Sequence, residues 1–133
     1  MGGVNVLDAN VVIGFLDGAN ANHEQAVALL GSCLGEPLGM HEVTIAEVLA
    51  GPAQLGRAAA QQVWAAIQEL GVSPLDRVAS PLDVALMRSS AGLPIPDCLV
   101  ILSAGPVSDA NPILTFDERL ASKARQMGYT VLP

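Results

Sequence analysis

Short apolar runs alternate along this chain with longer amphipathic segments, and this alternation is the main guide to its secondary structure. Apolar runs of a few residues, bounded by turn residues, are typical of buried strands. We expect strands over residues 4–7, 38–40, 72–78, 112–115 and 130–132, the third of them interrupted by Pro74. Because strands that alternate with helices form parallel sheets, the pattern predicts an α/β fold with a short, mostly parallel sheet flanked by helices.

The segments between these strands carry the spacing and the end signals of helices. We expect helices over residues 11–16, 23–34, 56–70, 81–90, from 97 to 102 or 104, and 118–127. In the second of them, the residues expected to face inward are Ala26, Val27, Leu29 and Leu30. Another helix is expected to begin at Thr44-Ile45-Ala46-Glu47, which matches a capping box, and to end at Gly51-Pro52. The chain carries no interdomain linker, so one domain over residues 1–133 is expected.

The charge of the chain argues against a simple nucleic-acid-binding protein. Asp and Glu number 13 against six Lys and Arg, and the formal net charge is −7. Proteins that bind phosphate backbones usually rely on basic patches. Bound cations or a basic partner would supply the missing positive charge. Aromatic residues make up only 3% of the chain, so stacking of bases on an aromatic platform is not expected.

The cysteines and the apolar runs bear on where the protein works. Cys33 and Cys98 show no metal-ligand spacing, and two reduced, buried thiols in the cytoplasm are expected, with one disulfide left open as the alternative. The first residues lack the basic region of a signal peptide. Apolar stretches fall well short of the ~20 residues that span a bilayer. We therefore expect a cytoplasmic protein without a membrane anchor.

Four acidic residues stand beside apolar runs, at a predicted strand end or helix start. They are Asp8, Glu47, Asp97 and Asp117. Ligands of open α/β sheets collect at the carboxyl ends of the strands, so these side chains are expected to converge there. Carboxylates in one pocket repel one another unless they are protonated or bind a divalent cation. Their hard oxygen atoms suit Mg²⁺ or Mn²⁺.

Each of these acids also has a local structural explanation. Asp8 and Asp117 are placed to cap the helices that follow them. Asp97 suits the positive end of a helix electrostatically. Glu47 occupies the third helical position of the capping box, where its side chain would bond locally. The residues alone leave both explanations open.

The four acids lie in motifs that resemble those of the PIN domain family of metal-dependent ribonucleases, and within it the small toxins of the VapC type. The motifs are Val6-Leu7-Asp8-Ala9-Asn10-Val11-Val12, Val43-Thr44-Ile45-Ala46-Glu47-Val48-Leu49-Ala50-Gly51, Pro96-Asp97-Cys98-Leu99-Val100-Ile101 and Leu114-Thr115-Phe116-Asp117-Glu118-Arg119-Leu120. Their order, their spacing and the chain length agree with the family. Bulky residues replace the alanines common after the third acid, and residues 51–92 carry no recognisable signature.

The resemblance implies a three-layer α/β/α fold and hydrolysis of RNA phosphodiester bonds with Mg²⁺ or Mn²⁺. It implies that Asp8, Asp97 and Asp117 bind the metal directly or through water, and that Glu47 binds metal or orients the attacking water. Supporting roles, as hydrogen-bonding neighbours or phosphate contacts, are expected for Asn10, Thr115 and Arg119. Structural roles are expected for His23, His41 and Trp64, and a solvated side chain for Arg88.

The partners expected from this resemblance are an RNA substrate, a cognate antitoxin protein and a second copy of the chain. A housekeeping nuclease of the same family and a non-catalytic module that binds RNA or protein are the alternatives. A Mg²⁺-dependent phosphatase or a receiver domain is disfavoured, because Asp8-Ala9-Asn10 lacks a second Asp and the only lysine, Lys123, lies inside a predicted helix. A gene for a small DNA-binding protein directly upstream would favour the toxin.

Overall fold

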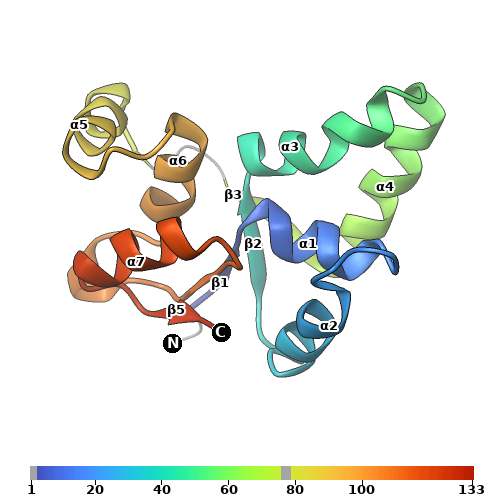
Figure 1. The fold of residues 1–133 in the computed structure, drawn as a ribbon, viewed down its shortest axis with the longest axis horizontal. Helices are drawn as coiled ribbons and strands as arrows, with labels where there is room; N and C mark the ends of the chain where they lie inside the picture. The colour runs from blue at the N-terminus through green and yellow to red at the C-terminus, as the bar shows by residue number, and fades with distance from the viewer. Residues whose placement is uncertain (1–2, 76–78) are drawn as a thin grey trace.

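The computed structural model describes residues 3–75 and 79–133, and within them a parallel sheet forms the centre of the molecule (Figure 1). Its strands are β1 (Asn5–Leu7), β2 (Leu38–His41), β3 (Val72–Leu75), β4 (Ile113–Leu114) and β5 (Val131–Leu132). Their order is β3-β2-β1-β4-β5, and each neighbouring pair is parallel. The predicted parallel sheet is confirmed, with β1 at its centre.

Helices cover both faces of this sheet and make a three-layer α/β/α fold (Figure 1). They are α1 (Ala9–Leu16), α2 (His23–Gly31), α3 (Glu42–Ala53), α4 (Arg57–Glu69), α5 (Pro81–Ala91), α6 (Ile95–Ser103) and α7 (Glu118–Gln126), with a 3-10 turn η1 (Val107–Asp109). Figure 1 shows α1 to α4 on one side of the sheet and α5 to α7 on the other. No single helix in the described ranges is long and apolar enough to cross a bilayer; only α5 and α6 together pass that test, bent by 111°.

The two central strands supply apolar side chains to both faces. Val6 and Ile113 belong to the core cluster under α6 and α7, whereas Leu7 and Leu114 belong to the cluster under α1 to α4. All four side chains are fully buried. Because successive strand residues point to opposite faces, a continuous apolar run is what a sheet covered on both sides requires. The sheet thereby holds the ends of β1 and β4 in a rigid frame.

The beginning of α3 differs from the sequence prediction. The helix starts at Glu42, and the ring nitrogen Nδ1 of His41 accepts the Val43 N–H at 3.0 Å. Thr44 therefore lies inside the helix, and the predicted capping box is wrong. The helix also continues through Pro52 to Ala53. Pro52 is the second-last residue of α3, so the one N–H that it cannot donate is lost only in the final turn of the helix. The chain then closes with the Gln54 and Leu55 N–H groups donated to the Gly51 and Pro52 carbonyls.

Two other helices have boundaries that the sequence pattern misplaced. The second helix ends at Gly31 rather than at residue 34, and Val27, expected to face inward, is 44% exposed. The sixth helix begins at Ile95, two residues before Asp97, because prolines fit a first helical turn that needs no backbone N–H donor. Asp97 is consequently the third residue of that helix. The remaining helices agree with the prediction to within two residues, including α1, which begins at Ala9 rather than at residue 11.

The edge of the sheet accommodates Pro74, which we expected to interrupt the third strand. Pro74 lies opposite Met40 in β3, and β3 is an edge strand, where a proline removes no interstrand hydrogen bond on the exposed side. The last predicted residues of that strand, 76–78, lie outside the described residues. Cys33 and Cys98 are both buried as free thiols, as expected.

Candidate active site

Asp8 lies at the carboxyl end of the central strand and is 7% exposed. Its Oδ1 accepts the Ala9 N–H at 2.8 Å and so caps α1. Its Oδ2 accepts the Thr115 hydroxyl at 2.7 Å and the Asn10 side-chain amide at 3.3 Å. The capping role is therefore real, and it occupies only one of the two carboxylate oxygens.

Asn10 and Thr115 connect the end of β1 to the end of β4. The Asn10 amide donates to Thr115 Oγ1 at 3.3 Å, and its Oδ1 accepts the Phe116 N–H at 3.0 Å. Thr115 Oγ1 in turn accepts the Asp117 N–H at 3.0 Å. These bonds hold the chain segment that carries Asp117 against the segment that carries Asp8. Thr115 is 3% exposed, so water competes little for its hydroxyl.

Asp117 caps the last helix, as its sequence position also suggested. Its Oδ1 accepts the N–H groups of Arg119 at 2.9 Å and Leu120 at 3.1 Å. Within residues 3–75 and 79–133, no hydrogen bond engages its Oδ2. Capping and ligand binding are therefore compatible for this residue, since they use different oxygens.

Asp97 approaches the site from α6, whose preceding loop is fastened by two arginines. Arg119 donates from Nη2 to the Gly92 carbonyl at 2.7 Å, and Arg88 donates from Nη1 to the Leu93 carbonyl at 3.1 Å. Burial raises the pKa of Asp97, and the positive charge of Arg119 opposes this rise without cancelling it. The sequence pattern identified Arg119 as a candidate phosphate contact, but it did not reveal that both arginines position this loop.

Glu47 lies in the middle of α3, on the helix that follows β2. Because α3 begins at Glu42, Glu47 is not a capping residue, and the local explanation for it is wrong. Its side chain is largely exposed, and the negative charges of Asp8 and Asp97 act on it. The four acids thus come from the loops and helices that follow β1, β2 and β4 and from the start of α6.

Electrostatic effects of the four carboxylates on one another link them at the carboxyl edge of the sheet. Burial raises the pKa of Asp8, and the charge of Asp117 adds to the shift, while hydrogen bonds from Thr115, Ala9 and Asn10 oppose it. Burial raises the pKa of Glu47, with further contributions from Asp8 and Asp97. Burial likewise raises the pKa of Asp97, with contributions from Asp8 and Asp117. Like charges that raise one another's pKa favour a bound proton or a bound cation.

The four carboxylates offer oxygen atoms as possible metal ligands. Among the His, Cys, Asp and Glu side chains of the described residues, no three are arranged closely enough to hold a metal ion as they stand. Mg²⁺ usually keeps several of its waters and binds proteins through one or two carboxylates, and carboxylate oxygens are the ligands that it prefers. The donor set therefore fits Mg²⁺ or Mn²⁺, with water or substrate oxygens completing the coordination.

One polar group of the second motif, the Thr44 hydroxyl, has a different environment from the one that its sequence position predicted. Thr44 is 1% exposed, and its Oγ1 has no hydrogen-bond partner in the described part of the chain. The motif pattern assigned this hydroxyl to a helix cap, whereas His41 fills that position. His41 and His23 both have structural contacts, since Nδ1 of His23 lies 2.9 Å from the Gly14 carbonyl.

The chain was compared with known families and structures. The family model for the PIN domain matches residues 6–126. FitAcB from Neisseria gonorrhoeae is similar in structure, with a TM-score of 0.68 and 23% identity over 98% of this chain and 97% of that one. VapBC2 from Rickettsia felis, bound to a DNA fragment from their promoter, has a TM-score of 0.67 and 13% identity over 98% of each chain.

A third similar structure is PAE2754 from Pyrobaculum aerophilum, with a TM-score of 0.63 and 20% identity over 96% of this chain and 87% of that one. No curated protein sequence matches the chain at a significant level. At these identities the structural likeness shows a common fold, and the family model reaches from the strand that carries Asp8 to the helix that Asp117 caps.

Proposed function

This chain belongs to the PIN domain family, whose members are generally nucleases, and we propose that it is a metal-dependent endoribonuclease that acts as the toxin of a type II toxin–antitoxin pair. The observation that carries the catalytic part is the group of carboxylates at the carboxyl edge of the sheet, where the Thr115 hydroxyl joins Asp8 to the backbone of Asp117 and the charges of Asp8 and Asp97 act on Glu47. Carboxylates that lie near one another favour a bound cation, and oxygen ligands select a hard one.

Asp8, Asp97 and Asp117 would hold Mg²⁺ or Mn²⁺, directly or through water. When bound, such an ion lowers the pKa of a water molecule and stabilises charge on the phosphate oxygens. Asp8 has its Oδ2 oriented by Thr115 and Asn10, and Asp117 keeps Oδ2 available. Glu47, exposed and outside any cap, either joins the ligands or accepts a proton from the attacking water.

Two rival functions fit the structure less well. A receiver domain or phosphatase needs a cation at a strand end to hold a phosphoryl group, whereas Lys123 lies within α7. A non-catalytic binding module needs no pocket of coupled carboxylates. A housekeeping nuclease would share the same site, and only its partners and its RNA would distinguish it from a toxin.

The toxin assignment is supported by the similar structures, which include toxin–antitoxin proteins of the VapBC and FitAB types. A hollow of about 430 Å³ beside Glu47 has apolar walls that include Ile13, Val48 and Val63, and the acidic side chains of Asp17 and Glu47 also line it. An antitoxin segment with apolar anchors and an Arg or Lys matches such a hollow, and its cation would neutralise the carboxylates in place of metal.

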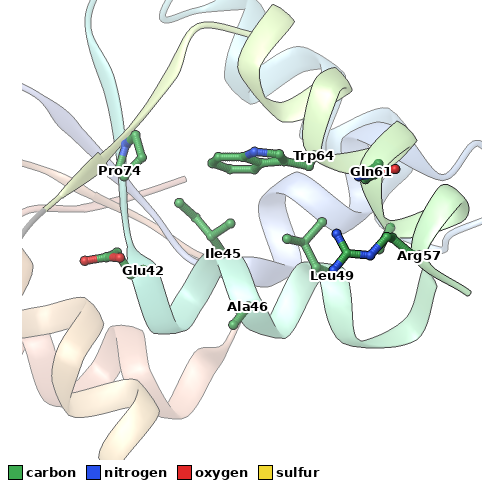
Figure 2. A pocket seen from close by; sticks show the side chains of 9 residues that line it. Glu42, Ile45, Ala46, Leu49, Arg57, Gln61, Trp64 and Pro74 are labelled. Carbon is green, nitrogen blue, oxygen red and sulfur yellow. The ribbon is translucent and has the colours of Figure 1, made fainter. Parts of the chain in front are cut away.

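A second apolar hollow, of about 520 Å³, lies between α3 and α4 (Figure 2). Figure 2 shows the Trp64 indole beside Ile45 and Leu49, with Glu42 toward one end and Arg57 toward the other. We assign this hollow to the same antitoxin. An amphipathic helix would bury its apolar stripe against Trp64 and meet opposite charges at the two ends.

Homodimerisation is part of the proposal, and α5 is its candidate surface. Leu82 and Leu86 lie one helical turn apart and are 67% and 58% exposed, and Ile95 at the start of the neighbouring helix is 52% exposed. Side chains four residues apart share a helix face. Covering that face with a second copy would remove the largest exposed apolar side chains of this helix from water. A cytoplasmic location is also proposed, in keeping with two free thiols.

The experiment that tests this function is an RNA cleavage assay on the purified chain. We expect cleavage that disappears with EDTA and returns with Mg²⁺ or Mn²⁺, and that Asp8→Ala abolishes. Asp83→Ala, an exposed acid in the first turn of α5, is the matched control and should cleave normally. An Asp8→Ala protein that cuts RNA as fast as the parent would refute the assignment. Light scattering and co-purification with the product of the neighbouring gene test the dimer and the antitoxin.

A further inference from the structure

Beside the carboxylate pocket lies a separate cavity of about 640 Å³, between α2 and α7. Thr115, Phe116 and Asp117, which border the candidate active site, form one of its walls. The lining also includes hydrogen-bonding side chains that the proposed catalytic reaction does not use. These are Asn22, Gln25, Ser122 and Arg125. The cavity has the size of a small-ligand site.

The polar side chains of this cavity have spare hydrogen-bonding capacity. Asn22 precedes α2, but its side chain makes no capping hydrogen bond. In the part of the chain that the structure describes, the Gln25 amide and the Ser122 hydroxyl have no hydrogen bond either. An amide presents a donor and an acceptor side by side, which is the pattern that reads the edge of a nucleobase.

The charges of the cavity favour an uncharged ring over a phosphate. Asp117 and Glu118 contribute two negative charges to its lining. The one cation of the described lining, Arg125, donates from Nη2 to the Val131 and Pro133 carbonyls at 3.0 Å each. A phosphate would meet net negative charge and a partly engaged arginine, whereas a neutral base meets no such repulsion.

An aromatic wall completes the arrangement. Phe116 is half-buried, packs with part of its surface against the core cluster under α1 to α4, and lines the cavity with another part. A ring anchored in this way offers a rigid stacking surface for one unpaired base, although the chain is too poor in aromatic residues to stack several.

We propose that this cavity binds the base of the nucleotide next to the scissile phosphate and thereby sets the sequence preference of cleavage. The inference rests on the proposed ribonuclease function, because Asp117 and Thr115 join the base cavity to the metal-binding pocket. The base stacks on Phe116, and the amides of Asn22 and Gln25 hydrogen-bond its edge. Asn22 and Gln25 are thus specificity residues, and neither touches the reacting atoms.

The first test is cleavage of an RNA library with one randomised region, followed by sequencing of the product ends. The wild-type chain is expected to prefer one base at a position adjacent to the cut. Asn22→Ala and Gln25→Ala should each reduce that preference about tenfold. Gln68→Ala, an exposed amide on α4, is the matched control and should keep it. A preference identical in the wild type and in the Asn22→Ala/Gln25→Ala double variant would overturn the proposal, as would uniform cleavage by the wild type.

A second measurement separates this proposal from the nuclease assignment. Fluorescence anisotropy measures the binding of short single-stranded oligoribonucleotides, each composed of a single type of base, to the Asp8→Asn variant. This assay requires no cleavage. The Asp8→Asn protein should discriminate among the four bases, and the added Asn22→Ala and Gln25→Ala changes should remove the discrimination. Equal affinity for all four bases on the Asp8→Asn background would overturn the base site. Discrimination without cleavage by the wild type would overturn only the nuclease assignment.

Discussion

The Thr115 hydroxyl donates a 2.7 Å hydrogen bond to Asp8 Oδ2, across 107 positions of the sequence. The Thr115 hydroxyl oxygen, Oγ1, also accepts the Asp117 N–H at 3.0 Å. One buried hydroxyl thus fixes two candidate metal ligands relative to each other, at the ends of two adjacent strands. This relationship accounts for a threonine at the end of β4 better than strand propensity alone, because propensity does not require its hydroxyl.

Replacing Thr115 by Val should weaken both metal binding and the fold. The variant keeps the shape of the side chain but removes the hydrogen bond to a buried carboxylate, which is worth about 1.5–3 kcal/mol of unfolding free energy. Loss of a group that orients a ligand also costs about 10–100-fold in metal affinity or activity. Urea denaturation and a Mn²⁺ titration of the cleavage rate measure the two effects. Thr115→Ser, which keeps the hydroxyl, should restore most of both, and equal behaviour of Val and Ser would show that the hydroxyl is dispensable.

The stability of the metal-free protein should fall as the pH rises. Burial and mutual repulsion raise the folded-state pKa of Asp8, Glu47 and Asp97 above their ordinary values of 3.8 for Asp and 4.5 for Glu. The folded protein therefore binds more protons than the unfolded chain. The stability from these groups is fully present below about pH 4 and is lost as the pH rises through the raised pKa values. Thermal unfolding with EDTA, from pH 4 to 8, measures the trend.

The matched comparison for the pH series is Asp8→Asn, which removes one repelling charge. Its melting temperature should exceed that of the wild type by a margin that grows with pH, and Mg²⁺ should narrow that margin. A margin that stays constant across the range would mean that the Asp8 pKa is not raised. A margin that Mg²⁺ leaves unchanged would mean that the ion does not bind beside Asp8.

Glu47→Gln should reduce RNA cleavage by at least about 100-fold, because a ligand or general base is lost. The fold should be equally stable or slightly more stable, since the change removes a charge that interacts with Asp8 and Asp97. Cleavage rates and melting temperatures are measured together. Glu69→Gln, an exposed acid at the end of α4, is the control and should cleave like the wild type. If the Glu47→Gln variant were less stable but cleaved RNA normally, Glu47 would have a structural role and not a catalytic one.

Thr44→Val should stabilise the protein by about 1 kcal/mol. The Thr44 hydroxyl is buried without a partner in the described residues, and leaving such a group unsatisfied costs about 1–3 kcal/mol. Valine has nearly the same shape, so packing is kept. Chemical denaturation gives the change in unfolding free energy. A loss of stability would mean that this hydroxyl has a partner in solution.

The boundaries of α3 show where sequence patterns fail. The capping box at Thr44 matched by residue type, yet His41 supplies the acceptor two residues before Val43. The capping residue is the one at which the backbone leaves the helical conformation, and a four-residue sequence motif does not determine which residue this is. Gly51-Pro52 likewise suggested an end, but the turn continues to Ala53.

The positions of Asp8 and Asp117 after β1 and β4 were easier to predict than these boundaries, because they depend only on where two apolar strands end. The runs before Asp8 and Asp117 are strongly apolar, and their adjacency follows from a parallel sheet. The arginine contacts to the Gly92 and Leu93 carbonyls could not be predicted, since Arg119 meets Gly92 across 27 residues of sequence. Nor could the cavity around Asn22, because α2 and α7 meet only in the folded chain.

A crystal of the wild-type chain soaked in Mn²⁺ tests the central claim most directly, because anomalous scattering locates the ion independently of any assay. We expect an anomalous peak among the carboxylates of Asp8, Glu47, Asp97 and Asp117, with ligand oxygens at about 2.1–2.2 Å and waters in the remaining positions. The same soak of Asp8→Asn crystals should show a weaker peak or none. A Mn²⁺ peak elsewhere, or an equally strong peak in the variant, would contradict the proposal that these acids form the metal site.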